Sequence, residues 1–320
     1  MKTILKVIFL FLVMISFTVT LGAKEYSVAI FDYDTRDEGK PSVAQHIKKQ
    51  LETSGLKFKA INLFTGKGVD NTSLEVLKRI EQDKYDLVIT ITSDAMEPAS
   101  YRLKTTPWLF TNVNNPEFFG VGNKHVPGEN RSGVSYYISA LKQMKLFNQV
   151  MEGKIKKVGF IFDYNAKSRN AEVIDFRSAA IKLHMKYRIK LLRNKYELPI
   201  IVKKLLDEKV DAIVITSSNK LYNNINLILD QSTQQKVPIF SVNKKGVEQG
   251  AIAAISSDYY KMVEENLIPM VIDVLEKGKS PGDLPIQFLK NPQLHFNITQ
   301  AKKLGLKIPT KLKTKIFKTY

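Results

Sequence analysis

Two well-separated apolar stretches of this chain end in nearly the same polar cluster. Ser27 to Asp34 reads SVAIFDYD, and Lys157 to Asn165 reads KVGFIFDYN. A short apolar run bounded by turn-forming residues is typical of a strand that is buried on both faces, as in a parallel α/β sheet. The repeat therefore predicts two such strands in equivalent places of two similar units.

Two further pairs of stretches follow in the same order and at nearly constant spacing. Asp86 to Ser93 (DLVITITS) matches Asp211 to Ser218 (DAIVITSS), and Thr106 to Asn112 (TPWLFTN) matches Val237 to Asn243 (VPIFSVN). Helical patterns alternate with these strands, which favours parallel sheets with right-handed crossovers. We therefore expect an α/β fold of two doubly wound parallel-sheet lobes, which suits a chain of 320 residues.

The first residues have the pattern of an export signal. Lys2 and Lys6 precede an apolar run from Val7 to Val19, and Leu21-Gly22-Ala23 resembles a small-residue cleavage site. We expect residues 1–23 to be a cleaved signal peptide, with an uncleaved membrane anchor as the alternative. The chain has no cysteine, which excludes disulfides, thiolate metal sites and lipidation of a cysteine. For a bacterial source these features predict a freely soluble periplasmic protein.

The strong positive charge of the chain does not indicate nucleic-acid binding. The formal net charge is +18, but the lysines are spread over predicted helix faces. A nucleic-acid site requires clustered charge and a recognisable binding motif. We therefore interpret the charge as solvated surface and expect no nucleic-acid partner.

Small polar residues follow the predicted strands throughout the chain. In open parallel sheets, ligands bind beyond the carboxyl ends of the strands, where loop amides and helix N-termini converge. Two lobes facing each other across such edges predict a cleft for a small polar or zwitterionic ligand. Helix capping is the alternative role of each residue taken singly. The candidate ligand-binding residues are Asp32, Tyr33, Ser93, Asp94, Asn112, Asn114, Asp163, Tyr164, Asn165, Ser217, Ser218, Asn219, Asn243 and Asp258.

The sequence gives no support for catalysis. The four histidines, His46, His125, His184 and His295, are far apart, and no metal-binding helix, nucleophile elbow or phosphate loop is present. We expect no enzyme activity, no metal and no cofactor. The single tryptophan, Trp108, is expected in the core.

Several motifs of the second half resemble those of a known family. They are Val158-Gly159, Asp211-Ala212-Ile213 with Asn219, Val237-Pro238-Ile239-Phe240, Gly250-Ala251, Asp258-Tyr259 and the stretch from Leu304 to Pro309. In the first half, Val113-Asn114-Asn115-Pro116 and Ser132-Gly133-Val134-Ser135 are similar to the family's Val-Thr-Asp-Pro loop and Thr-Gly-Val-Ser crossover. The chain thus resembles the type I periplasmic binding proteins, and among them the ABC transporter substrate-binding family that includes tryptophan-binding members.

The resemblance implies a domain division, a motion and a partner. The first lobe would take residues 24–134 plus 257–285, and the second 135–256 plus 286–320. The chain would cross between the lobes three times and form a hinge that closes on the ligand. The protein would be a monomeric solute-binding protein of an ABC importer, taking an amino acid or a related ligand to an inner-membrane permease. The alternative is a periplasmic sensor subunit for a histidine kinase or chemoreceptor.

Three departures from the family pattern fall on the expected binding positions. Asn114-Asn115 replaces Thr-Asp, Asp163-Tyr164-Asn165 replaces Asn-Pro-Ser, and Ser218 stands where an Asp usually precedes Asn219. These departures leave the identity of the ligand undetermined, whereas the fold does not depend on these positions.

Overall fold

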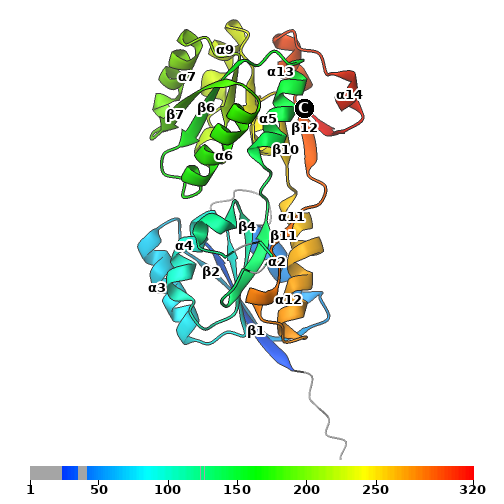
Figure 1. The fold of residues 1–320 in the computed structure, drawn as a ribbon. Coiled ribbons are helices and arrows are strands. Elements are labelled where there is room, and N and C mark those ends of the chain that lie inside the picture. Colours follow the sequence, from blue (N-terminus) through cyan, green and yellow to red (C-terminus); the bar gives the residue numbers. More distant parts are fainter. Residues whose placement is uncertain (1–23, 35–41, 123, 126) are drawn as a thin grey trace, which may run out of the picture.

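The computed structural model describes residues 24–34, 42–122, 124–125 and 127–320. The predicted signal peptide, residues 1–23, lies outside the described residues. Figure 1 shows two α/β lobes, one above the other, with the first lobe drawn in blue, cyan and orange and the second in green, yellow and red.

The first lobe is built on a six-stranded sheet whose strand pairs are all parallel, in the order β11-β5-β4-β3-β1-β2. Its strands are β1 (Glu25–Asp32), β2 (Lys57–Thr65), β3 (Leu87–Ile91), β4 (Trp108–Val113), β5 (Arg131–Ser135) and β11 (Gln287–Phe288). Its helices are α2 (Val43–Glu52), α3 (Asp70–Gln82), α4 (Ser93–Arg102), the short α11 (Tyr259–Met262) and α12 (Ile268–Leu275). Single turns η1 (Pro116–Phe119), η3 (Val263–Leu267) and η4 (Pro281–Asp283) complete it.

The second lobe contains a four-stranded parallel sheet, in the order β7-β6-β8-β9, and a separate three-stranded sheet. The strands are β6 (Lys157–Asp163), β7 (Lys186–Leu192), β8 (Ala212–Ile215), β9 (Ile239–Ser241), β10 (Ala253–Ser256), β12 (Gln293–Phe296) and β13 (Ile316–Thr319). The helices are α5 (Ala140–Val150), α6 (Arg169–Lys182), α7 (Leu198–Asp207), α8 (Asn219–Tyr222), α9 (Asn226–Gln234), α10 (Lys244–Glu248), α13 (Ile298–Lys303) and α14 (Thr310–Lys313). A single turn, η2 (Lys195–Glu197), precedes α7.

The repeated strands β1 and β6 are buried on both faces, as their sequences predict. In β1, Val28 and Ile30 pack in the core under α2 and α12, whereas Ala29 and Phe31 pack under α3 and α4. In β6, Phe160 faces the core beneath α5 and α6, and Ile161 faces the core beneath α7. Each parallel sheet therefore carries helices on both sides, and the doubly wound α/β prediction is confirmed.

Two details differ from the predictions, and a third confirms one. Strand β12 pairs with β10 antiparallel, so the second lobe is not wholly parallel. Gln287 and Phe288 pair with β5 of the first sheet, although residues 286–320 were assigned to the second lobe, because this segment adds an edge strand before it leaves the first lobe. Trp108 is fully buried beside Phe110 in the first-lobe core, as expected.

The chain passes between the lobes three times. The passages are residues 136–139 between β5 and α5, residues 257–258 between β10 and α11, and residues 289–292 between β11 and β12. They lie next to one another in the narrow waist of the molecule (Figure 1). All three connections are short, and each lobe has its own hydrophobic core.

Candidate ligand-binding site

A pocket lies at the waist and takes side chains from both lobes and from two of the passages between them. Its cavity volume is about 20 Å³, room for about one water molecule. The lining residues are Asn114, Asn115, Tyr136, Tyr137, Ile138, Gln143, Glu172, Asp175, Phe176, Ser217, Val242, Asn243, Ser256, Ser257 and Tyr259.

Tyrosines form one wall of the pocket. The rings of Tyr136 and Tyr259 lie 5.6 Å apart at a tilt of 55°, and Nδ2 of Asn243 donates to the Tyr259 hydroxyl at 3.1 Å. Burial raises the pKa of the Tyr136 phenol well above its usual value of 10.0, so the hydroxyl stays neutral. This wall offers flat apolar surface together with polar hydroxyl groups, a combination that suits an aromatic ligand.

Glu172 on α6 is the most deeply buried carboxylate of the pocket, with 4% of its surface exposed. Its Oε1 accepts hydrogen bonds from Nδ2 of Asn114 at 2.7 Å and from the Ser168 hydroxyl at 3.1 Å. Its Oε2 accepts from the Ser217 amide at 3.3 Å. Burial raises the pKa of Glu172 from 4.5 to about 7, although these donors oppose the rise.

The Glu172 hydrogen bond to Asn114 joins the two lobes. Asn114 follows β4 of the first lobe, and the Ser93 hydroxyl holds it in place by accepting its amide hydrogen at 2.9 Å. Glu172 belongs to the second lobe, 58 positions further along the chain. The contact therefore exists only while the lobes are together.

Asp175 lies one helical turn beyond Glu172 and has a different environment. Its Oδ2 accepts from the Tyr137 hydroxyl and from the Ala140 amide, each at 2.8 Å. Ala140 is the first residue of the 11-residue helix α5, so the carboxylate sits at a helix N-terminus, where the helix dipole stabilises negative charge.

A second contact between the lobes lies at the edge of the cleft. Nζ of Lys167, in the second lobe, is 2.8 Å from Asp70 and 3.1 Å from Glu97, both in the first lobe. The same ammonium lies 5.7 Å from the centre of the Tyr33 ring, and the Tyr33 hydroxyl donates to Asp70 at 2.9 Å. The hydrogen bond from Lys167 lowers the pKa of Asp70.

The structure brings Asn114, Ser217 and Asn243 of the predicted binding residues into the pocket. The other predicted residues of the first lobe lie elsewhere on the cleft-facing edge. Tyr33 belongs to the Lys167 contact, Ser93 supports Asn114, and burial raises the pKa of Asp94. Asp32 accepts from the Asp34 amide at 3.2 Å, and Asn112 is buried at the end of β4.

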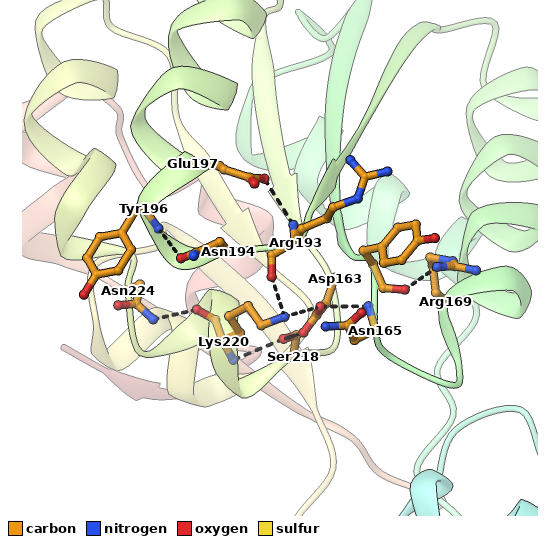
Figure 2. A network of polar contacts seen from close by, with 11 residues as sticks. Asp163, Asn165, Arg169, Arg193, Asn194, Tyr196, Glu197, Ser218, Lys220 and Asn224 are labelled. Carbon is orange, nitrogen blue, oxygen red and sulfur yellow. Dashed lines mark hydrogen bonds and ion pairs between the residues drawn. The ribbon is translucent and has the colours of Figure 1, made fainter.

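In the second lobe, Asp163 is the centre of a network that stays within that lobe (Figure 2). It accepts from Nζ of Lys220 and from the Ser218 hydroxyl, each at 2.7 Å, and from the Asn165 amide at 3.1 Å. Nζ of Lys220 also donates to the Arg193 carbonyl at 3.2 Å. None of these side chains is part of the pocket lining that the described residues form.

Tyr164 lies exposed at the rim of this network, with the Arg169 and Arg193 guanidinium groups 4.9 Å and 4.6 Å from the centre of its ring. Ser218 and Asp258 accept amide hydrogens at the N-termini of α8 and α11, and Asn219 is the first residue of α8. Ser218 and Asp258 therefore have the helix-capping role that was the alternative to ligand binding. Asn243 caps α10 and also lines the pocket.

Sequence reasoning missed Glu172, Asp175, Tyr136, Tyr137 and Tyr259 as pocket residues. Polar residues at strand ends indicate a site in a parallel sheet, whereas these residues lie on helices α6 and α11 and on the first passage between the lobes. One signal was available for Glu172. It falls on the helix face that also carries the buried Phe176 and Ala179, and a glutamate on a buried helical stripe is unusual.

Within the residues that the structure describes, no group of three or more His, Cys, Asp or Glu side chains is arranged to hold a metal ion. The same described ranges contain no helix that is both long and apolar enough to cross a membrane.

Comparison with known proteins identifies one family. The model for ABC transporter substrate-binding proteins matches residues 29–319. This is a family of binding proteins rather than of enzymes. A curated relative, the tyrosine-binding protein of Clostridioides difficile (strain R20291), is 26% identical over 236 residues, which are 73% of this chain and 67% of the relative.

Solved structures show the same fold. An ABC domain from Streptococcus pneumoniae in complex with L-Trp has a TM-score of 0.78 and 21% identity, covering 93% of this chain and all of that one. A ligand-free, open substrate-binding protein with adhesive properties from Clostridium difficile has a TM-score of 0.73 and 22% identity, covering 92% of this chain and 98% of that one.

Proposed function

This chain belongs to the family of ABC transporter substrate-binding proteins, and we propose that it captures an aromatic amino acid in the pocket between its lobes for delivery to an ABC permease. The observation that carries the proposal is the composition of the pocket. Tyrosine rings supply flat apolar surface, and a buried carboxylate stands beside hydroxyl and amide groups. An aromatic amino acid has a ring to pack on the tyrosines, and ammonium and carboxylate groups to bind the polar side chains.

The names of two similar proteins point to the same class of ligand. The Clostridioides difficile relative is a tyrosine-binding protein, and the Streptococcus pneumoniae domain was solved with L-Trp. Identity is low in both cases, so the choice between tyrosine, tryptophan and a related amino acid rests on this chain's own pocket.

Entry of the ligand requires the lobes to separate. A cavity of about 20 Å³ holds about one water molecule and is too small for an aromatic amino acid. The three adjacent passages at the waist supply a hinge. We propose an open form that admits the ligand and a closed form in which Glu172 again meets Asn114.

We place the protein in the periplasm as a monomer, with residues 1–23 removed as a signal peptide and the permease in the inner membrane. The proposed first lobe comprises residues 24–134 and 257–288, and the proposed second lobe residues 135–256 and 289–320. The last boundary follows β11, which pairs within the first sheet.

A thermal-shift screen of the protein without residues 1–23 tests the ligand class. The panel contains the aromatic amino acids, the remaining amino acids, sugars and nucleosides. A ligand present at 100 times its Kd stabilises the folded state by about 2.7 kcal/mol, which raises Tm by several degrees. We expect the largest shift with an L-aromatic amino acid and none with its D-enantiomer. Shifts with sugars or nucleosides alone would contradict the proposal.

Small-angle scattering tests the closure, and light scattering the monomer. The radius of gyration should fall when the best ligand of the screen is added at saturation. A radius that stays constant while calorimetry shows full occupancy would rule out hinge closure but leave the ligand assignment intact.

A further inference from the structure

Glu172 is a buried carboxylate held by hydrogen-bond donors that carry no charge. Asn114 supplies a side-chain amide, Ser168 a hydroxyl, and Ser217 both its backbone N–H and its hydroxyl. Placing an ionised carboxylate in a dry site is costly unless a counter-ion accompanies it. Hydrogen bonds from neutral donors therefore compensate the charge of an ionised Glu172 only in part, which agrees with the raised pKa of this carboxyl.

Two lysines near the ends of strands are engaged with other carboxylates. Lys167 is held by Asp70 and Glu97 across the cleft edge, and Lys220 is held by Asp163. Among the described residues that line the pocket there is neither a lysine nor an arginine.

The titratable groups around Glu172 add no positive charge. Asp175 on α6 is acidic, while Tyr136 and Tyr137 on the first passage, Tyr222 on α8 and Tyr259 on α11 carry phenols. Burial raises the pKa of Tyr136 and Tyr222 well above 10.0, so both are neutral in the protein.

The two oxygens of Glu172 differ in how fully they are used. Oε1 accepts two hydrogen bonds, at 2.7 Å and 3.1 Å. Oε2 accepts from the Ser217 amide at the long distance of 3.3 Å, and the Ser217 hydroxyl also donates to the carboxylate. Both donors are neutral, so a charged donor from a ligand would bind Oε2 more strongly than either of them. Glu172 lines the pocket, and a molecule bound there reaches it directly.

Asp175, the other carboxylate of the pocket, differs from Glu172 because a helix N-terminus already stabilises its negative charge. Both of its 2.8 Å hydrogen bonds fall on one oxygen, and one of them comes from the N-terminus of α5, which already favours negative charge. The need for a cation is therefore greater at Glu172 than at Asp175.

We propose that Glu172 determines the specificity of the pocket by accepting the ammonium group of the ligand at Oε2, so that the protein selects ligands with a primary ammonium group and rejects their deaminated analogues. The proposal rests on the proposed function, because it concerns the same pocket. Asn114 of the first lobe donates to the other oxygen of the same carboxylate. Glu172 would therefore bind the ammonium group and also form the contact between the lobes.

Calorimetric titration with matched probes tests this assignment. The probes are L-tyrosine, tyramine, which lacks the carboxylate, and 3-(4-hydroxyphenyl)propionate, which lacks the ammonium; the corresponding tryptophan series is run in parallel. We expect the deaminated acid to bind the wild type about 30- to 100-fold more weakly than the amino acid, the size of a lost charged hydrogen bond of about 2.0–2.8 kcal/mol. This comparison needs no variant.

The variant Glu172→Gln keeps the shape of the side chain and removes its charge. Its carbonyl oxygen can still accept from Asn114 and Ser168, while its amide replaces Oε2, the oxygen that accepts from the Ser217 amide at 3.3 Å. We expect the amino acid to lose about 30- to 100-fold in affinity and the deaminated acid to stay within threefold. Asp207→Asn is the matched control, because Asp207 is an exposed carboxylate on α7 that pairs with Lys203.

The outcomes separate the two proposals. If Glu172→Gln binds the amino acid as tightly as the wild type, or the deaminated acid binds as well as the amino acid, the role of Glu172 is overturned and the function stands. If tyramine or tryptamine binds and is lost in Glu172→Gln while no amino acid binds, the role of Glu172 stands and the proposed function falls. If neither amino acids nor amines bind the wild type, both fall.

Discussion

Two buried carboxylates of the second lobe, Asp163 and Glu172, are nine positions apart and differ in whether a cation pairs with them. Asp163 has its cation in the same lobe, Lys220 at 2.7 Å (Figure 2). Glu172 has no cation within reach among the described residues and takes its shortest hydrogen bond from the other lobe. The first arrangement survives any movement of the lobes, whereas the second changes whenever they move.

The difference shows how burial should be interpreted in this molecule. A carboxylate that is paired inside one lobe holds loops of that lobe together, as Asp163 does for the loops after β6 and β8. A carboxylate left without a counter-ion at the meeting of the lobes is suited to a ligand that brings the counter-ion. Proximity to a strand end, which Asp163 has and Glu172 lacks, does not separate the two roles.

The largest expected effect concerns pH and would sharpen the contrast. Burial raises the pKa of Glu172 to about 7 in the folded protein, above the ordinary value of 4.5. The folded state then binds more protons than the unfolded state between these values, so this residue lowers the free energy of unfolding as pH rises from 4.5 to above 7. The contribution reaches at most about 3 kcal/mol.

His295 works in the opposite direction, and the experiment must separate the two. Burial lowers the pKa of His295 from 6.5 to about 4, so its contribution to stability grows as pH rises from 4 through 6.5. Urea unfolding of the wild type and of Glu172→Gln is measured at pH 5, 6, 7 and 8. The contribution of His295 is the same in both proteins, so it cancels in the difference between their unfolding free energies. We expect the variant to gain stability relative to the wild type with rising pH; a constant difference would show that Glu172 titrates normally.

A smaller loss is expected for Asp163→Asn, and it should affect stability rather than binding. The substitution leaves Lys220 without its partner in a partly buried site, which costs about 2 kcal/mol of unfolding free energy. The Kd for the best ligand should stay within threefold, because Asp163 does not line the pocket. Urea unfolding and calorimetry measure the two quantities.

The double variant with Lys220→Met provides the control for this pair. Because the two side chains contact each other, the combined loss should be smaller than the sum of the single losses. Additive losses would mean that the ion pair contributes nothing to stability. A tenfold loss of ligand affinity in Asp163→Asn would show that Asp163, like Glu172, contributes to binding.

Lys167→Gln tests whether the contact at the edge of the cleft affects ligand binding, as Glu172 is expected to do, or only stability, as Asp163 is expected to do. The Lys167 side chain is 18% exposed, but those of Asp70 and Glu97 are about half exposed, so each pair is worth about 0.2–1 kcal/mol. We expect ligand affinity to fall about three- to tenfold, as the cost of closure without this contact.

In the wild type, 0.5 M salt should reproduce part of the Lys167→Gln effect by screening. Lys203→Gln, in an exposed pair within the second lobe, is the control and should change neither affinity nor its salt dependence. Equal affinity of Lys167→Gln and wild type at low salt would show that the contact does not contribute to closure.

The smallest expected effect is that of Tyr164→Leu at the rim of the Asp163 network. The ring lies between two arginines, and exposed contacts of this kind are worth about 0.5–1 kcal/mol each. We expect unfolding free energy to fall by about 1 kcal/mol or less, with no change in ligand affinity. A clear loss of affinity would mean that this rim belongs to the binding site.

The sequence predicted the parts of the fold that depend on short stretches of chain. Strands such as β1 and β6 are continuous apolar runs, and this pattern alone places them in sheets covered on both faces. The capping roles of Ser218 and Asp258 are equally local, because each side chain bonds amides within a few residues of itself. The binding residues stay a prediction, of which Asn114, Ser217 and Asn243 reach the pocket.

By itself, then, the sequence determined two doubly wound lobes and the polar edges of their sheets, because strand burial and helix capping are set by neighbours in the chain. The tertiary structure decided which polar groups meet across the waist. Glu172 and Asn114 are 58 positions apart and lie in different lobes, so no local pattern encodes their contact. Whether a buried carboxylate finds a cation depends on such distant neighbours, since electrostatic interaction acts through space and not along the chain.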